Sequence, residues 1–113
     1  MFDEVRSSYP LISPEADRQL QTKDLDCLMH HYWISPAGQL YRIDLGPAYD
    51  REVVREELRE HPWHFVQWVR NGRHGVLIAE SVDALVTLYP GGAGMPWREV
   101  RVFMRGGVIK EVL

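Results

Sequence analysis

The clearest structural signal in the sequence is the stretch of residues 28–45, which reads LMHHYWISPAGQLYRIDL. Its first half, residues 28–34, is rich in residues that favour strands. Pro36 suits the first inner position of a turn, and Gly38 can adopt the positive φ of a bulged hairpin loop. Residues 39–45 then alternate between apolar and polar, as a half-buried strand does. The stretch therefore predicts an antiparallel hairpin over residues 28–45.

Two more hairpins are predicted further along the chain. An Asn-Gly pair at residues 71–72 is the strongest two-residue hairpin signal and predicts a hairpin over residues 63–80. A Gly-Gly pair at residues 106–107 joins two alternating segments and predicts a closing hairpin over residues 97–113. Residues 82–89 form another apolar segment, which could be a strand or a short helix.

One helix is predicted, over residues 50–60. Asp50 can cap its N-terminus, and Pro62 ends it. Its apolar face is narrow, so we expect a surface helix lying across a sheet edge rather than a core helix.

The first part of the chain, residues 1–24, is rich in turn formers and is predicted to be an N-terminal arm. Ser13 can cap a short helical turn that Pro14 begins and that ends near Arg18. The remainder of the arm is expected to be extended.

These segments together predict one domain over residues 1–113, of mainly β (α+β) class. We expect an antiparallel meander or small sandwich of six to seven short strands with one surface helix. The length is typical of a single domain, and 45% apolar residues suffice for a core without disulfides.

The composition also bears on location and partners. The net charge is −3, which gives no basic footprint for nucleic acid. A single cysteine, Cys27, suits a reducing compartment. Neither a signal-like N-terminus nor an apolar run of about 20 residues is present in this sequence. We therefore expect a cytoplasmic protein with no membrane contact.

Five histidines and one cysteine raise the question of metal or nucleophile chemistry. On an extended strand Cys27 and His31 would lie about 13 Å apart, and His30 and His31 would point to opposite faces. No spacing matches a zinc ribbon or a metalloprotease helix, so we predict no metal, no cofactor and no catalytic residue. A small hydrolytic or metal-assisted enzyme stays open as an alternative. It requires at least three of the following residues to converge in one pocket: Asp24, Asp26, Cys27, His30, His31, His61, His64 and His74.

An aromatic and basic strand face near the C-terminus is a candidate binding surface. Arg101, Phe103 and Arg105 alternate on one strand face, and Trp97 lies shortly before them. Such residues are enriched at protein interfaces and also stack on single-stranded nucleic acid. Glu99 on the same face and the negative net charge argue against nucleic acid, which is kept as an alternative. We predict these four residues to be binding residues for a protein.

The block QTKDLDC at residues 21–27 follows MFD at residues 1–3 and YPL at residues 9–11. This arrangement resembles a set of small uncharacterised proteins of bacteriophages and prophages. The resemblance extends over residues 1–45 and, more loosely, over residues 97–113. It implies an accessory protein of a phage or prophage that acts inside a bacterial cell, and it implies no activity and no catalytic residues.

The block itself has two interpretations. Thr22, Asp24 and Asp26 can hydrogen-bond to nearby backbone and fix how the chain enters the first strand. Alternatively, Gln21, Thr22, Lys23 and Asp24 belong to a recognition surface. The resulting prediction is a phage-type accessory protein that acts by protein–protein binding, with homodimerisation through a sheet edge as one form of it.

Overall fold

The computed structural model describes residues 1–53, 66–71, 74–92, 94 and 98–113, with the backbone alone described at residues 49–53 and 66–70. Two compact units are formed, and each is described by itself. The first comprises Met1–Ile43 and Leu77–Leu113, and the second comprises Asp44–Val76.

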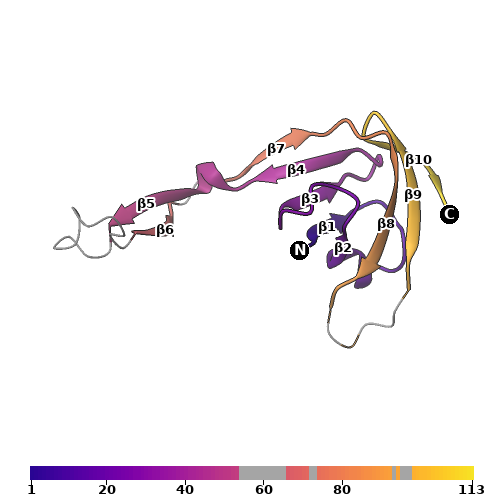
Figure 1. The fold of residues 1–113 in the computed structure, drawn as a ribbon, viewed down its shortest axis with the longest axis horizontal. Coiled ribbons are helices and arrows are strands. Elements are labelled where there is room, and N and C mark those ends of the chain that lie inside the picture. Colours follow the sequence, from indigo (N-terminus) through magenta and orange to yellow (C-terminus); the bar gives the residue numbers. More distant parts are fainter. Residues whose placement is uncertain (54–65, 72–73, 93, 95–97) are drawn as a thin grey trace. The chain divides into compact units, whose positions relative to one another are not determined.

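The first unit is built around a mixed sheet of eight strands (Figure 1). The strands lie in the order β10-β9-β8-β2-β1-β3-β4-β7. Their bounds are β1 (Asp3–Ser7), β2 (Leu20–Thr22), β3 (His31–Ile34), β4 (Leu40–Asp44), β7 (Val76–Ala79), β8 (Ala84–Pro90), β9 (Val100–Arg105) and β10 (Val108–Val112). Strand β1 pairs in parallel with β3 and antiparallel with β2. The mainly β class is confirmed, but the purely antiparallel arrangement of six to seven strands is wrong.

Two predicted hairpins are confirmed. Strands β3 and β4 pair antiparallel around a turn in which Gly38 has a φ of +86°. Strands β9 and β10 pair antiparallel around the turn at residues 106–107. Of the two alternatives for residues 82–89, the strand is correct, because β8 begins at Ala84 and pairs antiparallel with β9.

The second unit contains a two-stranded sheet, in which β5 (Tyr49–Val53) pairs antiparallel with β6 (Val66–Arg70). A short 3₁₀ helix, η2 (Gly46–Ala48), precedes β5. The surface helix predicted over residues 50–60 is wrong at its first four residues, which belong to β5; residues 54–60 lie outside the described residues. Pairing with β6 satisfies the backbone hydrogen-bonding groups of β5, whereas a helix with a narrow apolar face would bury little apolar surface.

The hairpin predicted over residues 63–80 is also wrong, because its two strands lie in different sheets. Strand β6 pairs with β5, and β7 lies beside β4. Asn71 instead binds back to η2: its backbone N–H donates to Ala48 O (3.1 Å) and its side chain to Pro47 O (3.1 Å). The Asn-Gly signal is local, so it could not show that β5 pairs with β6 and that β4 lies beside β7.

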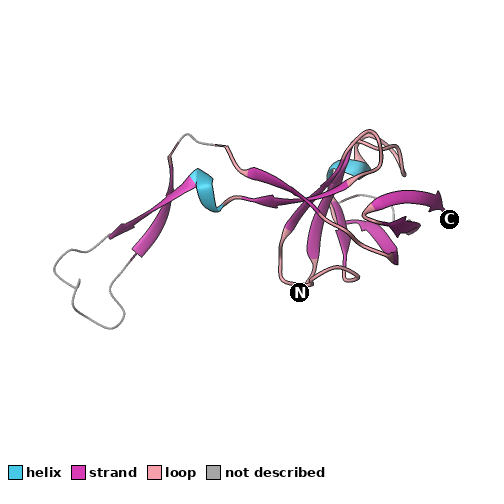
Figure 2. Ribbon diagram, turned by 90° about the horizontal axis from the view of Figure 1, so that it is seen from above, coloured by secondary structure: helices cyan, strands magenta, loops and turns pink. Residues whose placement is uncertain are grey.

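Residues 1–24 contain two strands and a 3₁₀ helix rather than an extended arm. Strands β1 and β2 lie in the middle of the sheet. The predicted helical turn is confirmed as η1 (Ala16–Arg18), where Ser13 Oγ accepts the Ala16 N–H at 3.2 Å (Figure 2). The alternation of β1 turns Asp3 and Val5 inward and leaves Glu4 and Arg6 exposed.

The core lies on one face of the sheet, where the two ends of the strand order approach each other. The Leu40 N–H donates to Gly107 O (2.7 Å) and the Ile109 N–H to Gly38 O (2.9 Å), so the turn before β4 is joined to the turn before β10. We call this joining of the two turns the closure of the sheet. It encloses a cluster of buried apolar side chains: Val5, Leu20, Tyr32, Ile34, Leu40, Val86, Leu88, Val100, Val102 and Met104. Burial of such side chains, each worth about 1.5–3 kcal/mol, holds the first unit together.

Candidate functional site

A groove of about 870 Å³ lies on the first unit, between the chain that follows β1 and the adjacent strands. Residues 6–14 and the 3₁₀ helix η1 contribute one part of its lining. Trp33 of β3, Ile43 of β4 and Leu77 of β7 contribute the rest. All of these residues belong to the first unit.

The N-terminal part of the lining is held in place by internal hydrogen bonds. The carboxylate of Asp17, which is 4% exposed, accepts the backbone N–H groups of Leu11 (3.0 Å) and Ile12 (2.9 Å). The Trp33 indole N–H donates to Ser8 Oγ at 2.9 Å, which anchors the segment to β3. Because these bonds form within the protein itself, the groove is preorganised for a ligand.

The groove combines apolar walls with an excess of positive charge among its lining residues. Leu11, Ile12 and Ile43 are half-buried, and Leu77 is 51% exposed. Arg6 and Arg18 are both exposed and both line the groove. Within the described parts of the chain, neither guanidinium forms an ion pair, and the one lining carboxylate, Asp17, is occupied by backbone donors. A ligand with apolar and anionic groups matches this lining.

An aromatic pair extends the groove along the same sheet face. Trp33 and Tyr41 stand opposite each other in the β3–β4 register. Their rings stack with centroids 5.5 Å apart and an interplanar angle of 27°. Both rings are only half-buried, so the pair adds a flat, partly exposed aromatic surface to the site.

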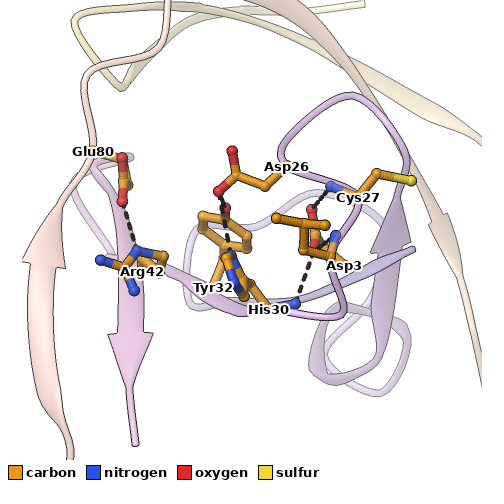
Figure 3. A network of polar contacts seen from close by, with 8 residues as sticks. Asp3, Asp26, Cys27, His30, Tyr32, Arg42 and Glu80 are labelled. Atoms are coloured by element: carbon orange, nitrogen blue, oxygen red, sulfur yellow. Dashed lines mark hydrogen bonds and ion pairs between the residues drawn. The ribbon is translucent and has the colours of Figure 1, made fainter. Parts of the chain in front are cut away.

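A second polar cluster joins the loop before β3 to that strand (Figure 3). The Tyr32 hydroxyl donates to Asp26 Oδ2 at 2.7 Å, and His30 Nδ1 lies 3.3 Å from the same oxygen. The Tyr32 hydrogen bond, with a smaller contribution from His30, lowers the pKa of Asp26. Burial, with the Asp26 hydrogen bond, raises the pKa of Tyr32. Both shifts favour the pair of an ionised carboxylate and a protonated phenol.

We expect Tyr32→Phe to lower the free energy of unfolding by about 1 kcal/mol at neutral pH, because it removes a hydrogen bond to a charged group that is half-exposed. The lowered Asp26 pKa stabilises the fold above about pH 4, and this contribution is lost on acidification through the folded pKa. The raised Tyr32 pKa stabilises the fold below about pH 10, and this contribution is lost above that value. The difference between wild type and variant should therefore shrink at both extremes.

Urea unfolding at pH 3, 7 and 10.5 measures this difference. Tyr41→Phe is the matched control, since its ring stacks on Trp33 and is half-buried. A Tyr32→Phe effect that stays constant from pH 3 to 10.5 would contradict the assignment.

The loop before β3 is organised around Asp3, which is fully buried. Its carboxylate accepts the backbone N–H groups of Cys27 (2.6 Å), Leu28 (3.1 Å) and His30 (2.8 Å). Cys27 and Met29 have positive φ values of 57° and 60°, which let the chain curl around this acceptor. The Cys27 thiol donates to Met1 O at 2.7 Å. The cysteine thus belongs to a structural junction between the N-terminus and the loop.

The residues named for the enzyme alternative do not gather in one pocket in the described structure. Asp26 contacts His30, but Asp24 accepts the Thr87 N–H (2.7 Å) and His31 pairs with Glu4 (3.0 Å). None of the six that the structure describes lines the groove. His74 lies in the second unit, and His61 and His64 lie outside the described residues. Over the same described portion, no group of three histidine, cysteine or acidic side chains could hold a metal ion.

The four predicted binding residues of the QTKDLDC block are spread over β2 and the loop after it. Thr22 is fully buried and its hydroxyl accepts the Asp24 N–H at 3.1 Å, so its side chain takes no part in an exposed surface. Gln21 is half-buried in β2, opposite Tyr89. Lys23 and Asp24 are exposed, and Asp24 anchors the loop to β8 through Thr87. The bond of Thr22 to the Asp24 N–H fits the structural interpretation, whereas Asp24 binds the distant backbone of Thr87 and Asp26 binds the side chains of Tyr32 and His30. A recognition role for Gln21, Lys23 and Asp24 stays a prediction.

Three of the other predicted binding residues lie on the solvent-facing side of β9. Arg101 and Arg105 are exposed, and Phe103 is half-buried. The Arg105 guanidinium lies 5.8 Å from the centroid of the Phe103 ring, a cation–π contact. Glu111 stands opposite Phe103 in the register, so a carboxylate offsets the positive charge there. Trp97 lies outside the described residues, and the binding role of this face stays a prediction.

Sequence reasoning did not identify the groove. Arg6 and Trp33 are far apart in the sequence and are neighbours because β1 pairs in parallel with β3, and Arg18 reaches the groove from η1. Asp17, five and six residues after the backbone groups that it binds, is the one local signal that the preceding segment folds back on itself.

No protein-family model matches the sequence, and no curated protein or solved structure matches the chain. In the described part of the chain, no helix combines the length and apolar character needed to cross a membrane.

Proposed function

We propose that this chain is an accessory protein of phage or prophage type that acts by binding another protein in the cytoplasm of a bacterial cell. The groove is its binding site, and the partner contributes an extended segment with acidic and apolar side chains. The observation that carries the proposal is the pair Arg6 and Arg18, which lines an apolar groove with no opposing free carboxylate in the described structure.

A protein segment fits the groove better than a small polar metabolite does. Small-molecule sites present a few convergent polar groups inside an apolar pocket. Here several polar groups at the groove already have partners within the protein: Asp17 binds two backbone N–H groups, Ser8 binds Trp33, and Ser7 binds Tyr9 O (2.6 Å). Apolar contact area and the two guanidinium groups remain for the ligand, and a peptide with both kinds of side chain uses both.

The phage or prophage setting rests on the resemblance of residues 1–45 to proteins of that origin. Its two key blocks are physically joined, since Asp3 of the first binds the Cys27 N–H of the second. Replacing Asp3 would remove the acceptor of this bond, whereas its donor is a backbone N–H that any residue except proline supplies at position 27.

We expect a fluorescein-labelled ten-residue peptide of alternating glutamate and leucine to bind the wild-type chain, as measured by fluorescence anisotropy. The double variant Arg6→Glu/Arg18→Glu should weaken this binding at least tenfold, because it replaces two attractive charges by repulsive ones. The matched control Arg98→Glu/Lys110→Glu makes the same charge change at two exposed residues outside the groove and should have an effect of less than threefold.

A lysine–leucine peptide of the same length tests charge selectivity, and it should bind more weakly than the acidic peptide. Equal binding of both peptides, or equal effects of the two double variants, would show that the groove does not select acidic segments.

A further inference from the structure

The two edges of the eight-stranded sheet differ in how they are protected. Strand β10 carries Lys110 and Glu111, has a bulge between Ile109 and Glu111, and begins with a bridge from Val108 to Gln39. Charges and bulges are the devices that keep edge strands from pairing with other chains. Strand β7, at the other edge, reads VLIA and has none of these charges, and its Leu77 is 51% exposed.

The backbone of β7 has hydrogen-bonding groups available on its outer side. The Glu80 N–H donates to Leu40 O at 3.0 Å, so the backbone of Glu80 faces β4. Along a strand successive residues direct these groups to opposite sides. Ile78 therefore also faces β4, whereas the N–H and C=O groups of Leu77 and Ala79 face away from it. Among the described strands, none lies beyond β7 in the sheet order.

The side chains of β7 connect this edge to the groove. Leu77 lines the groove together with Arg6 and Arg18. Ala79, two residues further along, presents its side chain on the same face as Leu77, while Ile78 is half-buried on the opposite face. A strand added next to β7 would place every second side chain on the groove side of the sheet.

We propose that the partner segment binds as an additional β-strand on β7, with the side chains of one face lying beside Leu77 at the edge of the groove that Arg6 and Arg18 also line. This inference rests on the proposed function and specifies how the groove takes its ligand. Backbone bonds to Leu77 and Ala79 supply affinity that is independent of the ligand's sequence, and the groove face supplies selectivity. The charge of the two arginines favours an acidic segment over a neutral or basic one.

The test uses the acidic glutamate–leucine peptide with the full chain. Ala79→Pro removes the outward N–H and adopts a φ that a strand tolerates, so it should weaken peptide binding at least tenfold. Ala79→Ser keeps that N–H and should bind within twofold of wild type. Circular dichroism and thermal unfolding of both variants check that the sheet is intact.

A second measurement leaves the protein unchanged. Two peptides are N-methylated at alternate residues, one on each edge of the peptide strand. Strand pairing predicts that methylation of one edge weakens wild-type binding at least tenfold and that methylation of the other changes it less than twofold. Equal effects of the two methylated peptides would overturn the proposal even if Ala79→Pro failed to fold.

The possible failures are distinguishable. Unchanged binding by a folded Ala79→Pro chain, with the arginine dependence intact, would overturn strand addition and leave the groove as a binding site. Absence of wild-type binding to the acidic peptide would overturn both proposals. A wild-type dimer in light scattering that dissociates in Ala79→Pro would show that a second copy of the chain occupies the edge, which also overturns the proposal.

Discussion

Replacing Asp3 by alanine is expected to lower the free energy of unfolding by about 3–5 kcal/mol, the size typical of breaking a buried charged interaction. The Asp3 side chain is fully buried and accepts the N–H groups of Cys27, Leu28 and His30. Truncation removes all three bonds and leaves the donors without an acceptor. Each donor that stays buried away from water costs about 1–3 kcal/mol of folding free energy. Water that enters the loop can bind some of these N–H groups, which reduces their summed cost to the expected loss of about 3–5 kcal/mol.

Equilibrium unfolding in urea measures the effect, with Glu4→Ala as control. Glu4 is the next residue in β1 but points to solvent, where its carboxylate is 56% exposed and pairs with His31. Exposed pairs contribute about 0–1 kcal/mol, so the control should stay within that range. Asp3→Asn should fall between the two, because an amide keeps one acceptor oxygen but directs an NH₂ group at N–H donors. Similar losses for Asp3→Ala and Glu4→Ala would contradict the role assigned to Asp3.

The role of Asp3 also explains why the sequence predicted some elements and not others. The hairpins of β3–β4 and β9–β10 depend on alternation and on turn residues that lie next to each other in the chain, and both were predictable. Strand β1 depends on a partner more than twenty residues away: Glu4 pairs with His31 and Asp3 with the Cys27 N–H. Turn-forming residues around positions 7–14 suggested an arm. No local sequence pattern shows that a strand pairs in parallel with a distant strand, so β1 could not be recognised.

The groove could not be predicted either, because it also depends on pairing between segments that are distant in the sequence. Its charged residues come from β1 and η1, and its apolar residues come from the segment between them and from β3, β4 and β7. Sequence analysis selected candidates by residue type within one segment, as for Arg101, Phe103 and Arg105, which share a strand face. A site assembled across parallel neighbours cannot be recognised in that way.

Gly107→Ala is expected to have the second large effect, a loss of about 4 kcal/mol or more, because it disrupts the closure of the sheet. Gly107 has a φ of +75°, which an alanine adopts only with strain. A Cβ at this position would also collide with the backbone carbonyl oxygen of Glu80. The collision cannot be relieved by a side-chain rotation, because backbone atoms are involved. Gly107 N–H donates to Val82 O (3.0 Å) and its carbonyl accepts the Leu40 N–H (2.7 Å), so any shift breaks bonds that join both ends of the sheet.

Gly106→Ala separates backbone strain from collision. Gly106 also has a positive φ, +59°, but a Cβ there meets no atom within 4 Å. We expect a loss of about 1 kcal/mol from strain alone, measured by the same urea unfolding as for Gly107→Ala. Gly107→Ala should in addition expose the amides of Leu40 and Ile109 to hydrogen exchange, since both donate across the closure. Equal losses in the two variants would mean that the close approach of Gly107 to Glu80 does not hold the sheet closed. The Leu40 and Ile109 amides would then stay protected in both.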